Sequence, residues 1–598
     1  MSGYPLNSAQ LAAASHSGSH AVVLAGPGTG KTRALVGRVL NLVVAGESPQ
    51  SLFICTFTNK AAQEMRLRIG SALKGGDIKV NVGSMWIGTF HSLCSRILRQ
   101  WHDTVGLSKD FEVIDVQGQV NLLDEAGVHW LDDKAILAEM IGRWKDTMVR
   151  PAEAEAQARL PEEHDAARAY AAYEEIKESR DVCDFADLIS IVVAALGTED
   201  HAIRDFVHSK FRHFLIDEFQ DVNALQVSFL QQAVEGGGRI WAVGDDDQSL
   251  YGWRGADVRY CVRFPNYFGK AQRYILDKNY RSPALVLDAA SAMIAHNTER
   301  VRKSLVPMVR PSPQNRISIH QFETSRDEAD WIAGGVKHLV DKGLEPQKIA
   351  VVFRTAALIP GIYGALAELG IAAEVVGMPP FWELPEASLF VGGLRWLENP
   401  KRTDLAGAAL PSERVLRDLQ PAAQDGNLKA VAAGMRKIVQ EAAPRGQGAD
   451  RTGAWIDTAA ELSQMLLAKG SIRAFLAFVE QGIRRDEEDL PRVILATIHA
   501  AKGLEWQAVF VAGCEAQMLP HHKSNDFEEE RRLAYVAMTR TRGSLVMSYA
   551  RNRFGKTQIP SPFLFEFATA DIRAPGEIVW PNRPAKPVTI SDIQESRG

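Results

Sequence analysis

Cysteine is scarce in this chain, with five residues in 598 and no pair at Cys-x-x-Cys spacing. They are Cys55, Cys94, Cys183, Cys261 and Cys514. Scattered cysteines argue against a zinc or iron–sulfur site and against a disulfide framework, and they favour a reducing compartment. Long apolar runs are also missing, since no segment approaches the roughly 18–20 residues that a membrane span needs. The start, MSGYPLNSAQ, lacks the basic and apolar segments of a secretory signal. We expect a cytoplasmic protein without a membrane partner.

An excess of positive charge is the third absence. The 68 lysines and arginines are outnumbered by 73 aspartates and glutamates, which gives a net charge of −5. Any site for nucleic acid must therefore be a local groove and not a basic surface. The 46% hydrophobic and 24% charged fractions are those of a globular protein. Because 598 residues exceed what one hydrophobic core usually supports, we expect several domains.

Short apolar runs, each followed by a turn and a helical pattern, recur in two sets. The first set comprises 21–25, 52–56, 214–217 and 240–245; the second comprises 317–321, 349–354, 493–498, 509–512 and 544–549. Continuous apolar strands that alternate with helices are typical of parallel sheets covered on both faces. The sequence thus predicts an α/β protein with two cores.

Two long stretches of helical pattern lie between these strands, and each suggests a helical domain inserted into a core. We predict a first core at 1–97 and 181–276 with an insert at 98–180. A second core at 277–398 and 491–570 would carry an insert at 399–490. The tail, 571–598, is punctuated by prolines, and we expect it to be flexible.

Residues 25–32 read AGPGTGKT, directly after an apolar run and before a helical pattern. This is a phosphate-binding loop with alanine in place of the first glycine of the strict pattern. Gly28, Thr29 and Gly30 would point backbone N–H groups at phosphate oxygens. Lys31 would reach the β- and γ-phosphates, and Thr32 would ligate Mg²⁺. The alternative, a glycine-rich turn that binds nothing, is disfavoured by the strand before it and the helix after it.

An acidic pair, Asp217-Glu218, ends another apolar run. Asp217 would hold Mg²⁺ and Glu218 would orient and deprotonate the attacking water. Many strands simply end in solvated acids, so the catalytic interpretation depends on the phosphate loop. A third run leads into VGDDDQSLYGWRGA, where Gln248 is a candidate sensor of the γ-phosphate.

Aromatic and basic residues cluster in the same segment: Tyr251, Trp253 and Arg254. Such a cluster can stack bases and hold a backbone. Single aromatics more often pack in a core, but glycines on both sides of Trp253-Arg254 favour an exposed platform.

The phosphate-binding loop, the Asp217-Glu218 segment and VGDDDQSLYGWRGA, in this order, resemble segments of the UvrD/Rep/PcrA-type helicases of superfamily one. The resemblance extends from about residue 6 to residue 566. Further matching segments are TFTNKAA (56–62), GTFHS (88–92), DFADL (184–188), LDKNYRS (276–282), FRTAA (353–357), ATIHAAKGLEW (496–506) and EERRLAYVAMTRT (529–541). The resemblance implies two RecA-like parallel-sheet P-loop cores, each with a helical inserted domain, and use of ATP and Mg²⁺.

The resemblance also implies roles at the nucleotide. Gln10 is similar to the glutamine that reads adenine, and Arg33 and Tyr280 to the pair that sandwiches its ring. Glu505 resembles the acid that contacts the ribose. The two arginines that reach the γ-phosphate from the second core correspond to Arg281 and Arg540.

Further residues are similar to those that line the path of single-stranded DNA in this family. Phe57, Tyr251 and Trp253 are similar to the aromatics between which bases flip. The residues expected to line the path are His91, Arg254, Arg354, His499 and Lys502. An isolated histidine is more often structural, and only the segments around His91 and His499 favour DNA.

We therefore expect an ATP-dependent 3′→5′ DNA helicase or translocase that is nucleoid-associated. The sequence does not distinguish DNA repair, replication restart, plasmid or phage replication, and removal of conflicts as its pathway. The second insert departs from the family, because it is short and lacks a Gly-Ile-Gly-type motif; Gly407 and Gly434 stand alone. One alternative is therefore a translocase that displaces proteins and unwinds poorly without a partner. A non-hydrolysing DNA-binding scaffold, an RNA motor and a helicase–nuclease subunit are less favoured. Expected partners are single-stranded DNA, single/double-strand junctions and a stimulating protein, with the chain a monomer or weak dimer.

Overall fold

The computed structural model describes residues 4–76, 78–128, 134–310, 316–400, 413–443, 448–487 and 490–597. It forms two compact units. The first contains Met1–Arg281 and Asn297–Met308, and the second contains Ser282–His296 and Val309–Gly598. We predicted a boundary between the two cores at residue 276. The first unit instead continues to Arg281 and also includes the later segment Asn297–Met308.

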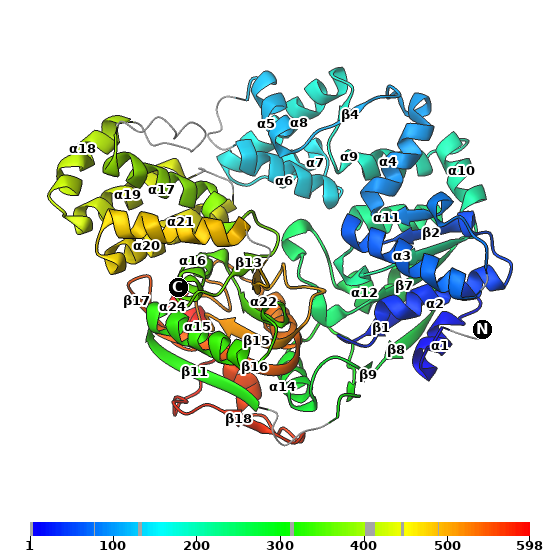
Figure 1. The fold of residues 1–598 in the computed structure, drawn as a ribbon. Coiled ribbons are helices and arrows are strands. Elements are labelled where there is room, and N and C mark those ends of the chain that lie inside the picture. The colour runs from blue at the N-terminus through cyan, green and yellow to red at the C-terminus, as the bar shows by residue number, and fades with distance from the viewer. Residues whose placement is uncertain are drawn as a thin grey trace. The chain divides into compact units, whose positions relative to one another are not determined.

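The first unit is built on a six-stranded parallel sheet with the order β3-β2-β6-β7-β1-β8 (Figure 1). Its strands are β1 (His20–Ala25), β2 (Leu52–Cys55), β3 (Trp86–Gly88), β6 (His213–Ile216), β7 (Arg239–Gly244) and β8 (Ala271–Leu276). Alternate residues enter two separate clusters: Val22 joins one and Val23 the other. Because a strand's side chains alternate between faces, both faces of the sheet are buried.

Helices cover both faces of this sheet. They are α1 (Ser8–Ala14), α2 (Lys31–Val44), α3 (Asn59–Gly75), α4 (Phe90–Gln100), α9 (Asp187–Leu196), α10 (Ala202–Lys210), α11 (Ala224–Ala233), α12 (Arg259–Val262) and α13 (Phe264–Phe268). The first insert has its own hydrophobic cluster. It consists of α5 (Val116–Glu125), α6 (Lys134–Asp146), α7 (Pro151–Gln157) and α8 (Pro161–Ser179), closed by the pair β4 (Glu112–Val113) and β5 (Val182–Cys183).

The second unit contains another sheet with the order β13-β14-β12-β15-β16-β11-β18, parallel throughout, with β17 antiparallel to β16. Its strands are β11 (Arg316–Thr324), β12 (Ile349–Phe353), β13 (Ala373–Val375), β14 (Val493–Thr497), β15 (Trp506–Ala512), β16 (Thr541–Arg553), β17 (Lys556–Thr557) and β18 (Glu577–Val579). Helices outside the insert are α14 (Ala284–Ile294), α15 (Ser325–Asp341), α16 (Ile359–Glu368), α22 (Phe527–Met538), α23 (Pro562–Ala568) and α24 (Ile590–Arg597). The two parallel sheets confirm the predicted α/β class, and every predicted strand is present.

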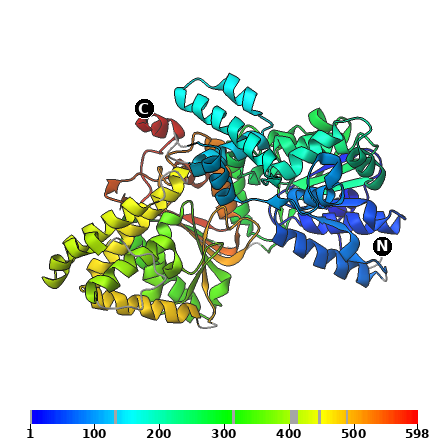
Figure 2. The same cartoon turned by 90° about the horizontal axis from the view of Figure 1, so that it is seen from above.

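The second insert is a helical group, coloured yellow-green to gold in Figures 1 and 2. Its helices are α17 (Pro385–Glu398), α18 (Glu413–Gln424), α19 (Leu428–Ala442), α20 (Gly448–Lys469) and α21 (Ile472–Glu487). Helix α17, which we had predicted in the core, contacts all four of the others. Gly434 lies on α19, where an added Cβ would collide with Leu419, whereas Gly407 lies outside the described residues.

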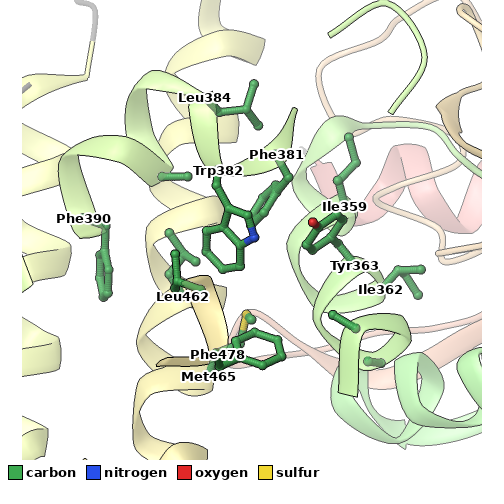
Figure 3. Packing of buried hydrophobic residues seen from close by; sticks show 14 of the residues in the cluster. Ile359, Ile362, Tyr363, Phe381, Trp382, Leu384, Phe390, Leu462, Met465 and Phe478 are labelled. Atoms are coloured by element: carbon green, nitrogen blue, oxygen red, sulfur yellow. The ribbon is translucent and has the colours of Figure 1, made fainter. Parts of the chain in front are cut away.

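One hydrophobic cluster joins this insert to its core (Figure 3). Trp382 lies between Tyr363 of α16 and Phe478 of α21, with ring-centroid distances of 5.9 and 6.2 Å. Phe381 and Tyr363 also pack together, at 4.8 Å. The second insert therefore shares its core with the adjoining sheet, unlike the first insert with its separate cluster.

The tail differs from our expectation of a flexible segment. Residues 577–579 form β18 on the edge of the sheet beside β11, and Trp580 packs on Phe565 with 4.8 Å between ring centroids. Pairing with an existing edge orders three residues that carry little strand signal of their own. In the described part of the chain, no single helix is long and apolar enough to cross a membrane; one bent pair within α20 and α21 meets the length and composition criteria.

Candidate nucleotide and DNA sites

The phosphate loop lies where β1 ends and α2 begins. Gly28 and Gly30 have φ values of 63° and 83°, in the left-handed region that glycine adopts without Cβ strain. Gly30 is the N-cap of α2 and provides no side-chain cap, so Lys31 and Thr32 occupy the first turn. The free N–H groups of a helix N-terminus and a lysine side chain favour a bound phosphate.

Gln10 holds this loop from one side. Its Nε2 donates to the carbonyl of Thr29 at 2.8 Å, while its Oε1 accepts from the backbone N–H of Asn7 at 3.0 Å. A Cβ on Gly30 would lie 2.5 Å from Gln10 Nε2, so this position requires glycine. A carboxamide has two N–H groups and two lone pairs, which leaves Gln10 one of each for a base edge.

The segment 279–281 holds the loop from the other side. Asn279 Nδ2 donates to the carbonyl of Pro27 at 2.5 Å, and the N–H of Tyr280 donates to the carbonyl of Gly28 at 3.0 Å. A Cβ on Gly28 would lie 2.5 Å from the Cβ of Arg281. Arg281 therefore belongs to the first unit and not, as we expected, to the second, because these contacts attach it to the phosphate loop.

Tyr280 is 45% exposed, and its hydroxyl accepts a hydrogen bond from Asn7 Nδ2 at 3.0 Å. Arg33 is exposed on the first turn of α2. Both predicted adenine-stacking side chains thus lie at the surface of the first unit, beside the loop.

Asp217 and Glu218 follow β6 directly. Glu218 adopts φ = 50°, which is strained for a residue with a Cβ and is typical of functional sites. Burial, with a further contribution from Glu218, raises the pKa of Asp217 to about 7, while Lys31 opposes the shift. A divalent cation beside Asp217 would favour its ionised form. The carboxylate of Asp217 and the hydroxyl of Thr32 are hard oxygen donors, so these residues fit Mg²⁺.

Gln220, which we did not predict as a site residue, links the acidic pair to Gln248. Its Nε2 donates to Glu218 Oε2 at 2.8 Å, and its Oε1 accepts from the N–H of Asp245 at 2.8 Å. Asp245 Oδ2 in turn accepts from Gln248 Nε2 at 2.5 Å. The position of Gln220, two residues after Glu218, was the only sequence signal for this role.

An aromatic platform follows β2 and β7, and we define it as Phe57, Tyr251, Trp253 and Arg254. The rings of Phe57 and Tyr251 stack at 4.7 Å between centroids, and Trp253 lies 6.5 Å from Tyr251. Arg254 places its guanidinium 4.6 Å from the centroid of the Trp253 ring. Trp253 is 56% exposed, which fits a stacking surface better than a core.

His91 lies near this platform. Burial, and next the charge of Arg254, lowers its pKa to about 4, so the ring is neutral at physiological pH. Its ring centroid is 6.0 Å from that of Phe185, which is 57% exposed. Phe185 in the DFADL segment therefore extends the exposed aromatic surface, although we did not single it out.

The second unit holds the remaining predicted residues. Arg354 makes a bidentate ion pair with Glu530 of α22, with contacts of 2.8–3.2 Å. This ion pair holds the guanidinium group of Arg354 in place within the second unit. Lys502 lies one turn after His499, beyond the end of β14, and donates its N–H to the His499 carbonyl at 3.2 Å. These three residues follow β12 and β14, which are neighbouring strands.

Arg540 and Glu505 lie further along the second sheet. Arg540 Nη1 donates to the carbonyl of Leu504 at 3.3 Å and its Nε to the carbonyl of Val536 at 2.9 Å. The neighbouring Glu505 is paired with Arg542, whose Nε lies 2.9 Å from Glu505 Oε1. The polypeptide thus orients the Arg540 side chain within the second unit.

One acidic cluster elsewhere in the first unit has the arrangement of a metal site: Glu174, Asp184 and Asp187. Lysines occupy it. Lys145 Nζ lies 3.1 Å from Glu174, 2.6 Å from Asp184 and 2.5 Å from Asp187, and Lys177 lies 2.8 Å from Asp187. These ammonium groups neutralise the carboxylates, so the cluster is a buried ion network.

Known proteins match nearly the whole chain. The sequence model of the UvrD/REP helicase N-terminal domain matches residues 6–269, and that of the UvrD-like helicase C-terminal domain matches 274–407 and 447–552. DNA helicase II of Salmonella typhimurium is 32% identical, with 94% of this chain and 86% of that protein covered. DNA helicase II of Escherichia coli is 31% identical with the same coverage, and the ATP-dependent DNA helicase PcrA of Leuconostoc citreum is 28% identical.

Both family domains are thus found in the order in which the two units follow along the chain. The resemblance inferred from the motifs is confirmed, and the chain belongs to the UvrD/REP family of DNA helicases.

Proposed function

We propose that this protein is an ATP-driven motor that moves 3′→5′ along single-stranded DNA and couples ATP hydrolysis to strand separation. The observation that supports it most is a chain of contacts within the first unit. Gln220 joins Glu218 to Asp245, and Asp245 holds Gln248, three residues before Tyr251. A change at the nucleotide can therefore reach the aromatic platform through a few hydrogen bonds.

The first unit would carry out the ATPase chemistry. Gly28, Thr29, Gly30 and Lys31 would hold the phosphates, with Gln10, Arg33 and Tyr280 around the base. Thr32 and Asp217 would hold Mg²⁺, which supplies charge stabilisation to the phosphates. Glu218 would take the proton of the attacking water, and Gln220 fixes that carboxylate through its 2.8 Å hydrogen bond. Gln248 and Arg281 would contact the γ-phosphate.

Further residues of the second unit have proposed roles that rest on the family resemblance. Arg540 would stabilise charge on the transferred phosphoryl group, and Glu505 would contact the ribose. Arg354, His499 and Lys502 would contact the DNA backbone. For Arg354 this requires a contact in addition to its ion pair with Glu530.

DNA would bind the platform without sequence preference, because every base has a face that can stack on an aromatic ring. Phe57, Tyr251 and Trp253 would stack bases, and Arg254 and His91 would line the path. Since burial lowers the pKa of His91 to about 4, it would act as a neutral hydrogen-bonding group. We propose that a monomer or weak dimer carries out this activity in the cytoplasm, in association with the nucleoid.

The direction and product of this activity are tested with partial duplexes. Duplexes with a 3′ tail and duplexes with a 5′ tail are mixed with the protein and ATP, and the separated strand is measured. We expect unwinding that depends on the 3′ tail. Unwinding that prefers the 5′ tail would contradict the proposed polarity.

A second candidate function is a translocase that displaces proteins and unwinds poorly without a protein partner. The second insert favours this candidate, because it lacks a Gly-Ile-Gly-type motif and because residues 408–446, which include α18 and α19, lie outside the segments that the C-terminal family model matches. The duplex assay is therefore run beside an assay of movement on single strands. Movement without strand separation supports the second candidate, and absence of both contradicts the motor.

A further inference from the structure

Residues 297–308, which we call the strap, belong to the first unit although the chain on both sides belongs to the second. The strap is preceded by α14, which contacts α22 and α23 of the second unit. Its end forms β10 (Val306–Pro307), which pairs in parallel with β9 (Lys278–Asn279). The strap is thus part of the first unit, and the chain continues from each of its ends into the second unit.

Lys303 places its ammonium group among three consecutive carboxylates. It contacts Asp245 at 3.2 Å, Asp247 at 3.0 Å and also Asp246, and its side chain is only 1% exposed. Burial disfavours the charge on Lys303, but the three carboxylates outweigh it and hold its pKa well above the usual range.

Two neighbours in the strap strengthen this attachment. Arg300 makes a bidentate pair with Asp247, with contacts of 2.7 and 2.8 Å. The N–H of Val301 donates to Asp246 at 2.7 Å. A buried cluster of this kind is rigid when all its groups are satisfied and costly to disrupt when one partner is removed.

The same cluster sets the position of Gln248. Asp245 uses Oδ1 for Lys303 and Oδ2 for the Gln248 amide. Its backbone N–H is held by Gln220, the residue that also holds Glu218. Lys303 therefore lies one carboxylate away from the candidate γ-phosphate sensor.

The strap also contacts the phosphate loop. A Cβ on Gly26 would collide with the Leu305 side chain, so Leu305 lies directly against the start of the loop. Strand β10 pairs with β9, which carries Asn279, and Asn279 donates to the Pro27 carbonyl at 2.5 Å. One segment of twelve residues thus supports both the loop and the Gln248 segment.

We propose that the strap is a positioning element of the motor. Lys303 and Arg300 hold Asp245–Asp247, the segment directly before Gln248, and Leu305 holds the phosphate loop. The inference rests on the proposed function and deepens it. Because the strap is joined at both ends to the second unit, displacement of that unit would be transmitted to both parts of the nucleotide site. DNA-stimulated hydrolysis would require this attachment.

The test uses the full chain and four variants. Lys303→Met removes the buried charge, and Lys303→Arg keeps it. Leu305→Ala shortens the side chain that lies against the phosphate loop at Gly26. Arg553→Met is the matched control, because Arg553 is a buried cation, 3% exposed, that pairs with Glu328 and Glu515 of the second unit. Steady-state ATPase is measured with and without oligo(dT), and binding of methylanthraniloyl-ATP with Mg²⁺ is measured without DNA. Thermal melting checks that each variant is folded.

We expect Lys303→Met to lower the oligo(dT)-stimulated kcat about tenfold with a smaller change in the KM for ATP, and Lys303→Arg to restore most of it. Leu305→Ala should weaken binding of the ATP analogue about fivefold. Arg553→Met should lower the melting temperature without this loss of stimulation.

Full stimulation in Lys303→Met, or an equal loss in Arg553→Met that follows its melting temperature, would overturn the role of Lys303. Unchanged binding of the analogue by Leu305→Ala would overturn the role of Leu305. If the unmodified chain shows no stimulation by DNA, the proposed function fails, while analogue binding still decides whether the strap positions the loop.

Discussion

The ring of Phe57 stacks on that of Tyr251, with 4.7 Å between centroids and 22° between planes. Phe57 follows β2 and Tyr251 follows β7, so two strand ends meet in one aromatic pair. The two rings contact each other directly. A base that enters between them must separate them, whereas a base that stacks on the outside leaves the pair intact.

Loss of one ring of this pair should weaken DNA binding. Phe57→Ala removes a stacking face, which is worth about 1–3 kcal/mol per base. Fluorescence anisotropy with labelled oligo(dT) should therefore show a higher Kd for the variant. Trp331→Ala removes an exposed ring of α15 that lies outside the platform and is the control. Equal Kd values for Phe57→Ala and the unmodified chain would remove Phe57 from the DNA path.

The charge of Arg254 should be visible in the salt dependence of binding. Arg254→Gln should reduce the slope of log Kd against log salt by about 1, as expected when one phosphate contact is lost. Arg212→Gln is the control, because Arg212 is exposed just before β6, at the other end of the strand from the candidate site.

Loss of the His91 side chain, unlike loss of the Arg254 charge, should not change the salt dependence of DNA binding. The His91 pKa of about 4, set by burial and by Arg254, means that the ring carries no charge above pH 5.5. His91→Gln should therefore leave the salt slope unchanged at every pH from 5.5 to 8. A slope that rises as the pH falls through 6 in the unmodified chain but not in His91→Gln would mean that His91 is protonated in the DNA-bound state.

Glu218 should be needed for turnover but not for nucleotide binding. Glu218→Gln keeps the shape and the hydrogen bond to Gln220 but removes the proton acceptor, so kcat should fall about 10²–10⁴-fold. Binding of methylanthraniloyl-ATP should persist. Substantial DNA-stimulated hydrolysis by this variant would exclude Glu218 as the general base.

Nucleotide binding should release a proton from Asp217. Burial and Glu218 raise the pKa of Asp217 to about 7, so in the free protein part of this carboxyl is protonated near neutral pH. Mg²⁺ requires the ionised form, and affinity for Mg-ATP should therefore increase from pH 6 to pH 8. Titration calorimetry in buffers of different ionisation enthalpy should detect proton release near pH 7 that decreases as the pH rises toward 9. Asp217→Asn should abolish the release; persistence of the release in that variant would assign the proton to another group.

Local patterns predicted much of the fold and of the nucleotide site. The apolar runs marked most strands of the two sheets but missed β8, in which Leu276 alone is buried, and AGPGTGKT lies at the predicted junction of β1 and α2. Contacts between distant residues could not be read in this way. Lys303 is 57 residues from Asp246, and no spacing rule connects a lysine after one helix to aspartates after a strand.

Arg281 shows the same difficulty. The family resemblance and the predicted boundary at residue 277 assigned Arg281 to the second core, whereas its contacts with the phosphate loop attach it to the first unit. In the tail, prolines suggested disorder, but three residues gained order from an existing sheet edge. Both errors arise because tertiary contacts override the local signal.

Movement along a single strand tests the account most directly. Oligo(dT) strands of increasing length, with a fluorophore at the 5′ or the 3′ end, are bound by the protein, and ATP is added with a trap for free protein. We expect a signal from the 5′ label after a lag that grows with strand length, and no such lag with Glu218→Gln. A signal independent of length, or a growing lag only with the 3′ label, would contradict a motor that moves 3′→5′ on single-stranded DNA.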